Sequence, residues 1–96
     1  MDLRVSSRAE ADIASAFDWY QERGTDLGVD FVRCVDATMA LIQRSPQIFR
    51  ERYGGMRMAM TPRFPYGIYF LWDSGTDFIS VRRVLSFSQN APAHLK

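Results

Sequence analysis

The spacing of apolar residues changes part-way along this chain, and that change limits the folds open to it. In the first half, apolar side chains recur every three or four residues, which is the period of one helix face. These positions are Ala9, Ile13, Ala16, Phe17 and Tyr20, then Phe31, Val32, Val35, Met39 and Ile42. In the second half the period is two, because Met56, Met58 and Met60 alternate with Arg57 and Ala59. The pattern predicts two helices followed by strands.

The predicted helices have recognisable ends. Ser7 and Glu10 form the S-x-x-E pattern of a capping box, which predicts the start of the first helix, and Gly24 is a natural stop. The second helix is predicted from about Asp26, and Pro46 ends it. The connector "GTDLG" is short, so we expect the two helices to fold back as an antiparallel hairpin.

One short strand, "LRVS" (residues 3–6), is predicted before the first helix, and three more after the second. These three are the methionine run (56–60), "PYGIYFLWD" (65–73) and "FISVRRVLS" (78–86), while "SPQIFRERYGG" before them is interpreted as a loop. The predicted order is β-α-α-β-β-β. This is an α+β fold with an antiparallel helical hairpin packed on one face of a mostly antiparallel sheet.

Length and composition limit the domain organisation and the compartment. With 96 residues, 47% of them hydrophobic, the chain has enough material for one core, so we expect a single domain over residues 1–96. No stretch has the apolar length of a signal peptide or a membrane span, which favours a cytosolic protein with no membrane partner. Cys34 is the only cysteine, which excludes an intramolecular disulfide, and we expect a buried, inert thiol.

The sequence lacks the motifs of common catalytic and cofactor sites. It has no Gly-rich phosphate loop, no HExxH, no CxxC and no G-x-S-x-G. The carboxylates fall on the predicted exposed sides of the helices, and a metal site would need more than His94 and scattered acids. We therefore expect no cofactor, no metal and no catalytic residue.

The two halves of the chain carry opposite charge. Residues 1–43 hold four arginines and eight acids, a net charge of −4, whereas residues 44–96 hold eight basic residues and three acids, a net charge of +5. A basic patch for nucleic acid or an acidic protein partner is one interpretation, and ordinary salt bridges to the protein's own acids are the other. The candidate patch residues are Arg50, Arg52, Arg57, Arg63, Arg82 and Arg83. Strand alternation at Arg82 and Arg83 predicts that one of these two side chains lies near the helix-covered side.

A polar tail follows the last predicted strand. Phe87, Gln89, Asn90, His94 and Leu95 combine an aromatic ring, amides and a C-terminal apolar residue, the mixture that a protein-binding strip uses. We therefore take these five as candidate target-binding residues. The alternative is that Phe87 and Leu95 pack back on the sheet while the rest of the tail frays.

Several segments together resemble one family. The start "LRVSSRAEADIASAFDWY", a second helix ending "LIQRSPQIF", then "RFPYGIYF", "ISVRRVL" and a polar tail are similar to the RelE/ParE superfamily of toxins from bacterial type II toxin–antitoxin modules. The resemblance runs the length of the chain, and "RFPYGIYF" after an arginine-containing loop is its most telling part. It implies the same fold and an antitoxin as partner.

The superfamily has two activities, and the tail distinguishes them. RelE-like members are ribosome-dependent mRNA endonucleases that use basic residues plus a histidine or tyrosine near the end of the last strand. ParE-like members lack that chemistry and poison DNA gyrase. Here the position after "VL" is Ser86, followed by Phe87, and neither serves as an acid or base near neutral pH. The tail "SQNAPAHLK" carries the Asn-Ala and His-Leu pairs of the ParE side, with Ser86 and Pro92 as departures.

The resemblance therefore predicts a ParE-like toxin without catalysis of its own. It would inhibit DNA gyrase by binding, be neutralised by a cognate ParD-like antitoxin, and contact operator DNA only through that antitoxin. One alternative is a RelE-like mRNA endonuclease, supported by Tyr66 and Tyr69 among the arginines. The other is a degenerate member that retains only antitoxin binding.

Overall fold

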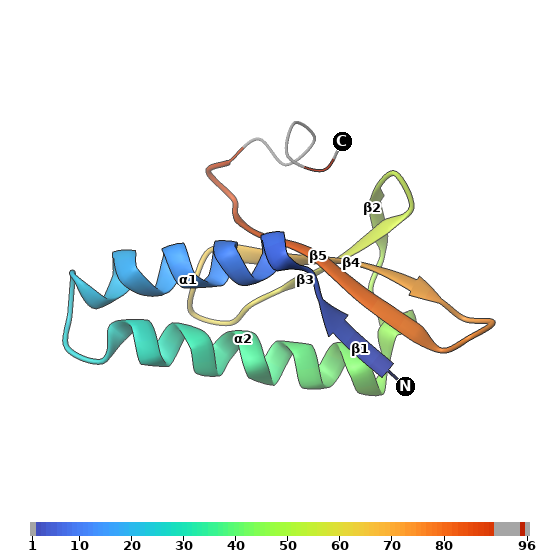
Figure 1. Cartoon of the computed structure of the whole chain (residues 1–96), viewed down its shortest axis with the longest axis horizontal. Coiled ribbons are helices and arrows are strands. Elements are labelled where there is room, and N and C mark those ends of the chain that lie inside the picture. Colours follow the sequence, from blue (N-terminus) through green and yellow to red (C-terminus); the bar gives the residue numbers. More distant parts are fainter. Residues whose placement is uncertain (1, 90–94, 96) are drawn as a thin grey trace.

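Two layers make up the computed structural model, which describes residues 2–89 and 95. Helices α1 (Ser7–Gln21) and α2 (Leu27–Arg44) lie side by side against one face of a five-stranded sheet (Figure 1). The strands are β1 (Asp2–Val5), β2 (Glu51–Tyr53), β3 (Met56–Met60), β4 (Tyr66–Asp73) and β5 (Phe78–Ser86), and a 3₁₀ turn, η1 (Pro46–Ile48), follows α2. The predicted α+β fold with a helical hairpin on a mostly antiparallel sheet is confirmed.

The strands are ordered β1-β5-β4-β3-β2 in the sheet. All neighbours are antiparallel except β1 and β5, which run parallel. The prediction that the segment before β3 is only a loop was wrong, because Glu51–Tyr53 forms the edge strand β2. All three of its residues are exposed, so no buried face gives it an alternating pattern that the sequence could reveal.

The start of α1 differs by one residue from the predicted capping box. Ser6, not Ser7, is the N-cap, and its Oγ accepts a hydrogen bond from the Ala9 amide at 3.0 Å. The backbone N–H of Ser6 still donates to the Val81 carbonyl of β5 at 2.9 Å, and its Oγ also donates to the Arg82 carbonyl at 2.8 Å. Ser6 is thus held by the sheet on one side and caps the helix on the other, which fixes where α1 begins.

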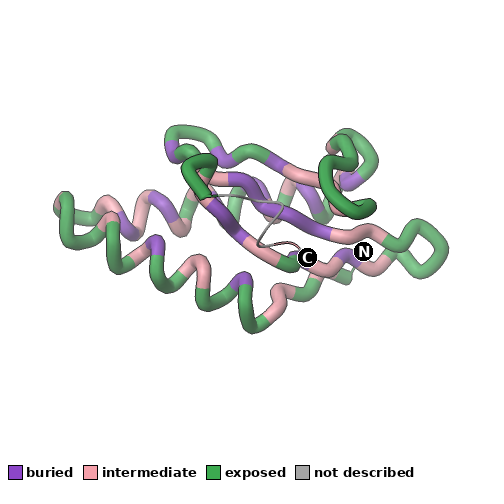
Figure 2. Tube along the Cα trace, turned by 90° about the horizontal axis from the view of Figure 1, so that it is seen from above, coloured by how far each residue is buried: buried purple, intermediate pink, exposed green. Residues whose placement is uncertain are grey.

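The main core lies between the helices and the sheet. Figure 2 shows buried segments along the middle of the strands and on the inner sides of the helices. The fully buried large side chains include Phe31, Val35 and Ile42 of α2, with Ile68 and Phe70 of β4 and Ile79, Val81 and Val84 of β5. The predicted helix stripes therefore face the sheet as expected.

The two helices approach closely at Gly28. A Cβ built on Gly28 would lie 2.7 Å from the Phe17 carbonyl oxygen and 2.8 Å from Gln21 Oε1. The missing side chain also lets Gln21 Oε1 accept a hydrogen bond from the Gly28 amide at 2.9 Å. The hairpin thus depends on a residue with no side chain at the start of α2.

The face of the sheet turned away from the helices, here called the open face, carries a smaller cluster. Tyr69 and Leu85 are buried there, with Met56, Met58 and Leu95 packed against them. Because Ile68 and Phe70 point to the helices, Tyr69 between them must point to the open face. Leu95 therefore lies against the sheet on the side opposite the helical hairpin.

Candidate functional site

The two neighbouring arginines of β5 lie at an irregularity of the strand. Tyr69 of β4 is opposite Arg83, whereas the next residue, Phe70, is opposite Val81. Arg82 is the extra residue, so the strand bulges there and simple alternation does not hold. Arg82 is exposed, while the Arg83 side chain retains 15% exposure.

Arg83 and Asp12 tie α1 to β5. The Asp12 carboxylate accepts hydrogen bonds from Arg83 Nε at 2.7 Å, from Arg83 Nη2 at 2.9 Å and from the Val84 amide at 2.9 Å. The hydrogen bond to Asp12 raises the pKa of the Arg83 guanidinium further above its ordinary value, against the opposing effect of burial. The expectation that one of the arginine pair lies toward the helices is confirmed, and that arginine is Arg83.

The six candidate arginines lie on different sides of the sheet, and Arg57, Arg63 and Arg83 lie toward the helices. Arg57 donates to the Phe49 carbonyl and lies over the Trp72 ring, and both partners belong to the core under the helices. Arg63 is 3.7 Å from the Asp30 carboxylate of α2.

The six arginines are divided because acidic side chains and backbone carbonyls of the same chain lie close to three of them once the helices pack on the sheet. Three of the six arginines, Arg57, Arg63 and Arg83, take such partners. Arg50, Arg52 and Arg82 are exposed. Arg52 lies close enough to Tyr69 to oppose the rise that burial and Tyr53 impose on the pKa of the Tyr69 hydroxyl. Within this set, the exposed arginines that have no ion pair among the described residues therefore lie at the β2 edge and at the β5 bulge.

The start of the tail is held by the end of the sheet. The Phe87 amide donates to the Pro65 carbonyl at 2.9 Å, and Gln89 Oε1 accepts from the Ser86 amide at 2.8 Å. The Phe87 side chain is 45% exposed, whereas Leu95 packs into the open-face cluster. The candidate target-binding residues Asn90 and His94 lie outside the described residues. Of the predicted strip, Phe87 and Gln89 are thus available at the surface, and Leu95 packs back on the sheet.

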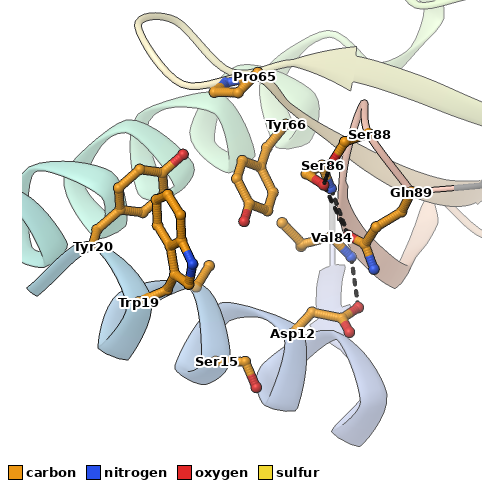
Figure 3. A pocket seen from close by; sticks show the side chains of 11 residues that line it. Asp12, Ser15, Trp19, Tyr20, Pro65, Tyr66, Val84, Ser86, Ser88 and Gln89 are labelled. Atoms are coloured by element: carbon orange, nitrogen blue, oxygen red, sulfur yellow. Dashed lines mark hydrogen bonds between the residues drawn. The ribbon is translucent and has the colours of Figure 1, made fainter. Parts of the chain in front are cut away.

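A groove that the sequence did not reveal runs along α1. It has a volume of about 500 Å³, and α1 contributes Asp12, Ser15, Ala16, Trp19 and Tyr20 to it. Pro65, Tyr66, Val84 and Ser86 form the facing wall, and Ser88 and Gln89 close one end (Figure 3). Of these α1 residues, only Ala16 and Tyr20 belonged to the predicted apolar stripe, where they were interpreted as core residues, so the groove wall was missed.

Two aromatic residues of the groove wall pack against aromatic rings of the core. The Tyr20 ring stacks on Phe31 at 5.3 Å and meets Phe64 edge-on at 4.8 Å, and the Tyr66 ring meets Phe31 at 4.9 Å. Burial raises the pKa of both the Tyr20 and Tyr66 hydroxyls, so both are neutral near pH 7. Rings held in this way give the groove a fixed shape.

Among residues 2–89 and 95, no group of three or more His, Cys, Asp or Glu is placed to hold a metal ion. Tyr66 and Tyr69, the predicted tyrosines of an RNA-binding face, lie on opposite sides of the sheet. The candidate surfaces are the groove, the exposed tail base and the two separated arginine positions.

Comparison with known proteins decides the family. The family model described as the ParE toxin of the type II toxin–antitoxin system parDE matches residues 3–91. The chain belongs to the ParE toxin family. No curated protein sequence matches it significantly.

Solved structures agree with this ParE-family fold. One chain of a chromosomal ParDE toxin–antitoxin system from P. aeruginosa is 17% identical with a TM-score of 0.64, and the match covers 90% of this chain and 95% of that one. One chain of the RelBE2 toxin–antitoxin complex from Mycobacterium tuberculosis is 15% identical with a TM-score of 0.58, covering 88% and 95%. At these identities the likeness extends to the fold. No helix among residues 2–89 is long and apolar enough to cross a membrane.

Proposed function

We propose that this ParE-family protein is the toxin of a type II toxin–antitoxin module that inhibits DNA gyrase by binding it. Family membership provides the toxin class. The observation that carries the choice of gyrase over RNA is the division of the candidate RNA-cleaving tyrosines between two faces. Tyr66 lines the groove under α1, while Tyr69 is 4% exposed in the open-face cluster.

Phosphodiester cleavage needs a base for the 2′-hydroxyl and an acid for the leaving oxygen at one place. At the end of β5, the Ser86 hydroxyl is occupied by Ser88 and Gln89. Burial raises the pKa of both tyrosine hydroxyls, so the phenolate form that would act as the base is rarer still near neutral pH. A protein that works by contact, without acid–base chemistry, fits these groups better than a nuclease does.

The exposed tail base is the proposed gyrase contact. Phe87 presents an aromatic ring, 45% exposed, on a backbone anchored by Pro65, and aromatic residues are enriched among interface anchors. A cognate antitoxin is proposed to neutralise the protein and to supply any contact with operator DNA. The exposed arginines Arg52 and Arg82 fit the acidic segments of such a partner.

The test is a gyrase supercoiling assay run beside an assay of mRNA cleavage on translating ribosomes. We expect inhibition of supercoiling and intact mRNA, and we expect Phe87→Ala to weaken the inhibition by at least about tenfold. Arg33→Ala, an exposed change on α2, serves as the matched control. Codon-specific cuts in mRNA with unaffected supercoiling would overturn the proposal in favour of the RelE-like activity. Antitoxin binding with neither activity would identify a degenerate member.

A further inference from the structure

Three methionines of β3, Met56, Met58 and Met60, project onto the open face of the sheet. They alternate with residues that face the helices, and one of these, Ala59, is fully buried in the main core. Met56 and Met58 pack against the open-face cluster around Tyr69, whereas Met60 is 64% exposed. The same strand thus presents two thioethers within an apolar cluster and one at the surface.

The thioether of Met58 occupies the space beside Gly67 of β4. In the register of these strands, Met58 lies opposite Tyr69, and Gly67 lies opposite Met60. A Cβ built on Gly67 would lie 3.0 Å from both Cγ and Sδ of Met58 and 3.2 Å from Cε2 of Tyr69. Because Gly67 has no side chain, the Met58 sulfur can lie against the strand backbone and beside the tyrosine ring, a neighbour that thioethers favour.

The same cluster contacts a residue from the C-terminal end of the chain. Leu95 packs against Tyr69 and Leu85 together with Met56 and Met58. The other four members belong to the strands β3, β4 and β5, whose places are fixed by the backbone hydrogen bonds of the sheet. The packing of Leu95 therefore reports on the state of the methionine side of the cluster.

We propose that Met58 is a reversible oxidation site at which hydrogen peroxide changes the packing of the open face. A lone pair of the thioether sulfur attacks one peroxide oxygen, the O–O bond breaks, and a proton moves to the leaving hydroxide. The products are methionine sulfoxide and one water molecule. Reduction by a methionine sulfoxide reductase, with two thiols oxidised to a disulfide and the oxygen released as water, restores the thioether.

Oxidation at this position should loosen the cluster. The sulfoxide is polar, so it is more stable in water than between apolar side chains. We expect the oxidised side chain to leave its place beside Gly67 and to take away the contact that Leu95 makes with it. This modification is independent of the target that the protein inhibits, and it would link the open face to the level of oxidant in the cell.

Met60 provides the matched control within the same strand. Its side chain is the most exposed of the three and is not among the residues packed in the open-face cluster. Exposure favours oxidation, so we expect Met60 to react with peroxide at least about threefold faster than Met58. Since Met60 supports no part of the cluster, its sulfoxide should leave the position of Leu95 unchanged.

The experiment treats the whole protein with hydrogen peroxide. It uses a Cys34→Ser background, because the free thiol also reacts with peroxide. Tandem mass spectrometry assigns the added oxygen to each methionine. The methyl resonances of Leu95, which are sensitive to the nearby Tyr69 ring, report on its packing, and thermal unfolding reports on stability.

We expect the Leu95 resonances to move toward those of an unfolded peptide in proportion to Met58 sulfoxide, and the melting temperature to fall by at least about 4 °C. Methionine sulfoxide reductase should reverse both changes. Met58→Leu, which conserves volume, should abolish the response, whereas Met60→Leu should retain it.

Three results would overturn the proposal. The first is Met58 sulfoxide with unchanged Leu95 resonances and melting temperature, and the second is an unoxidised Met58 after Met60 has reacted completely. The third is a Met58→Leu variant that responds to peroxide as the background does. If Met58→Leu does not fold, the time course of the Met60→Leu variant decides, because Leu95 must then follow the oxidation of Met58.

Discussion

Removal of the Asp12 charge should destabilise the protein more than any other single change of charge on α1. In Asp12→Asn the side chain keeps its size, but the guanidinium of Arg83 loses both of its charge-assisted hydrogen bonds to Asp12. The Asp12 and Arg83 side chains are only 14% and 15% exposed, so water replaces the lost partner poorly. The change removes the carboxylate that pairs with the largely buried charge of Arg83.

The size of the effect follows from that burial. Breaking a fully buried ion pair by removing one partner costs about 3–5 kcal/mol. The residual exposure lowers this, and we expect Asp12→Asn to reduce the free energy of unfolding by about 3 kcal/mol. Asp12→Ala should cost about 1 kcal/mol more, because the Val84 amide then loses its acceptor as well. In a domain of this size the loss is a large share of the total stability.

Urea unfolding followed by tryptophan fluorescence measures these values, and a double-mutant cycle isolates the pair. Arg83→Gln combined with Asp12→Asn should be less destabilising than the sum of the two single changes, by about 1–3 kcal/mol. Glu10→Gln, an exposed change on the same helix, should stay within about 0.5 kcal/mol of the wild type. A loss below about 1 kcal/mol for Asp12→Asn, with no coupling in the cycle, would refute the argument.

Three further predictions concern local features of the fold. Ser6→Ala should lower the free energy of unfolding by about 1–2 kcal/mol because it removes the N-cap of α1, whereas Ser7→Ala should cost under about 0.5 kcal/mol in the same urea titration; equal effects would contradict the assigned cap. Gly28→Ala should cost about 1–3 kcal/mol, measured by thermal unfolding, since its Cβ would collide with the Phe17 carbonyl oxygen; an unchanged melting temperature would show that the helices can separate freely. The folded-state pKa of Tyr66 is raised above the ordinary 10.0, so the folded state holds its proton longer and stability should fall as pH rises above about 10; Tyr66→Phe should reduce that fall, and an identical pH dependence would contradict it.

The candidate site was only partly accessible from the sequence. The tail base at Phe87 and Gln89 was predicted as a surface strip because its composition is unusual for the end of a strand. The six arginines were grouped by sequence position, and the structure divides them, since Arg63 and Arg83 meet acids of the helices. The groove carried no motif at all, because it is made by residues that are ordinary in their own elements.

The amino-acid sequence by itself determined the two helices, every strand except β2, and the two layers that they form. The apolar period of 3–4 in one half and 2 in the other dictates which residues each helix and strand must bury, and that is a local property. Tertiary structure alone decided the bulge at Arg82, the cap at Ser6, the edge strand β2 and the groove along α1. The strand β2 was hidden because all its residues are exposed, whereas the bulge, the cap and the groove depend on atoms from distant parts of the chain; Asp12 and Arg83, for example, are separated by 71 positions. The contact between Asp12 and Arg83 depends on how the helices pack on the sheet, and no local sequence pattern encodes a contact between residues so far apart in the chain.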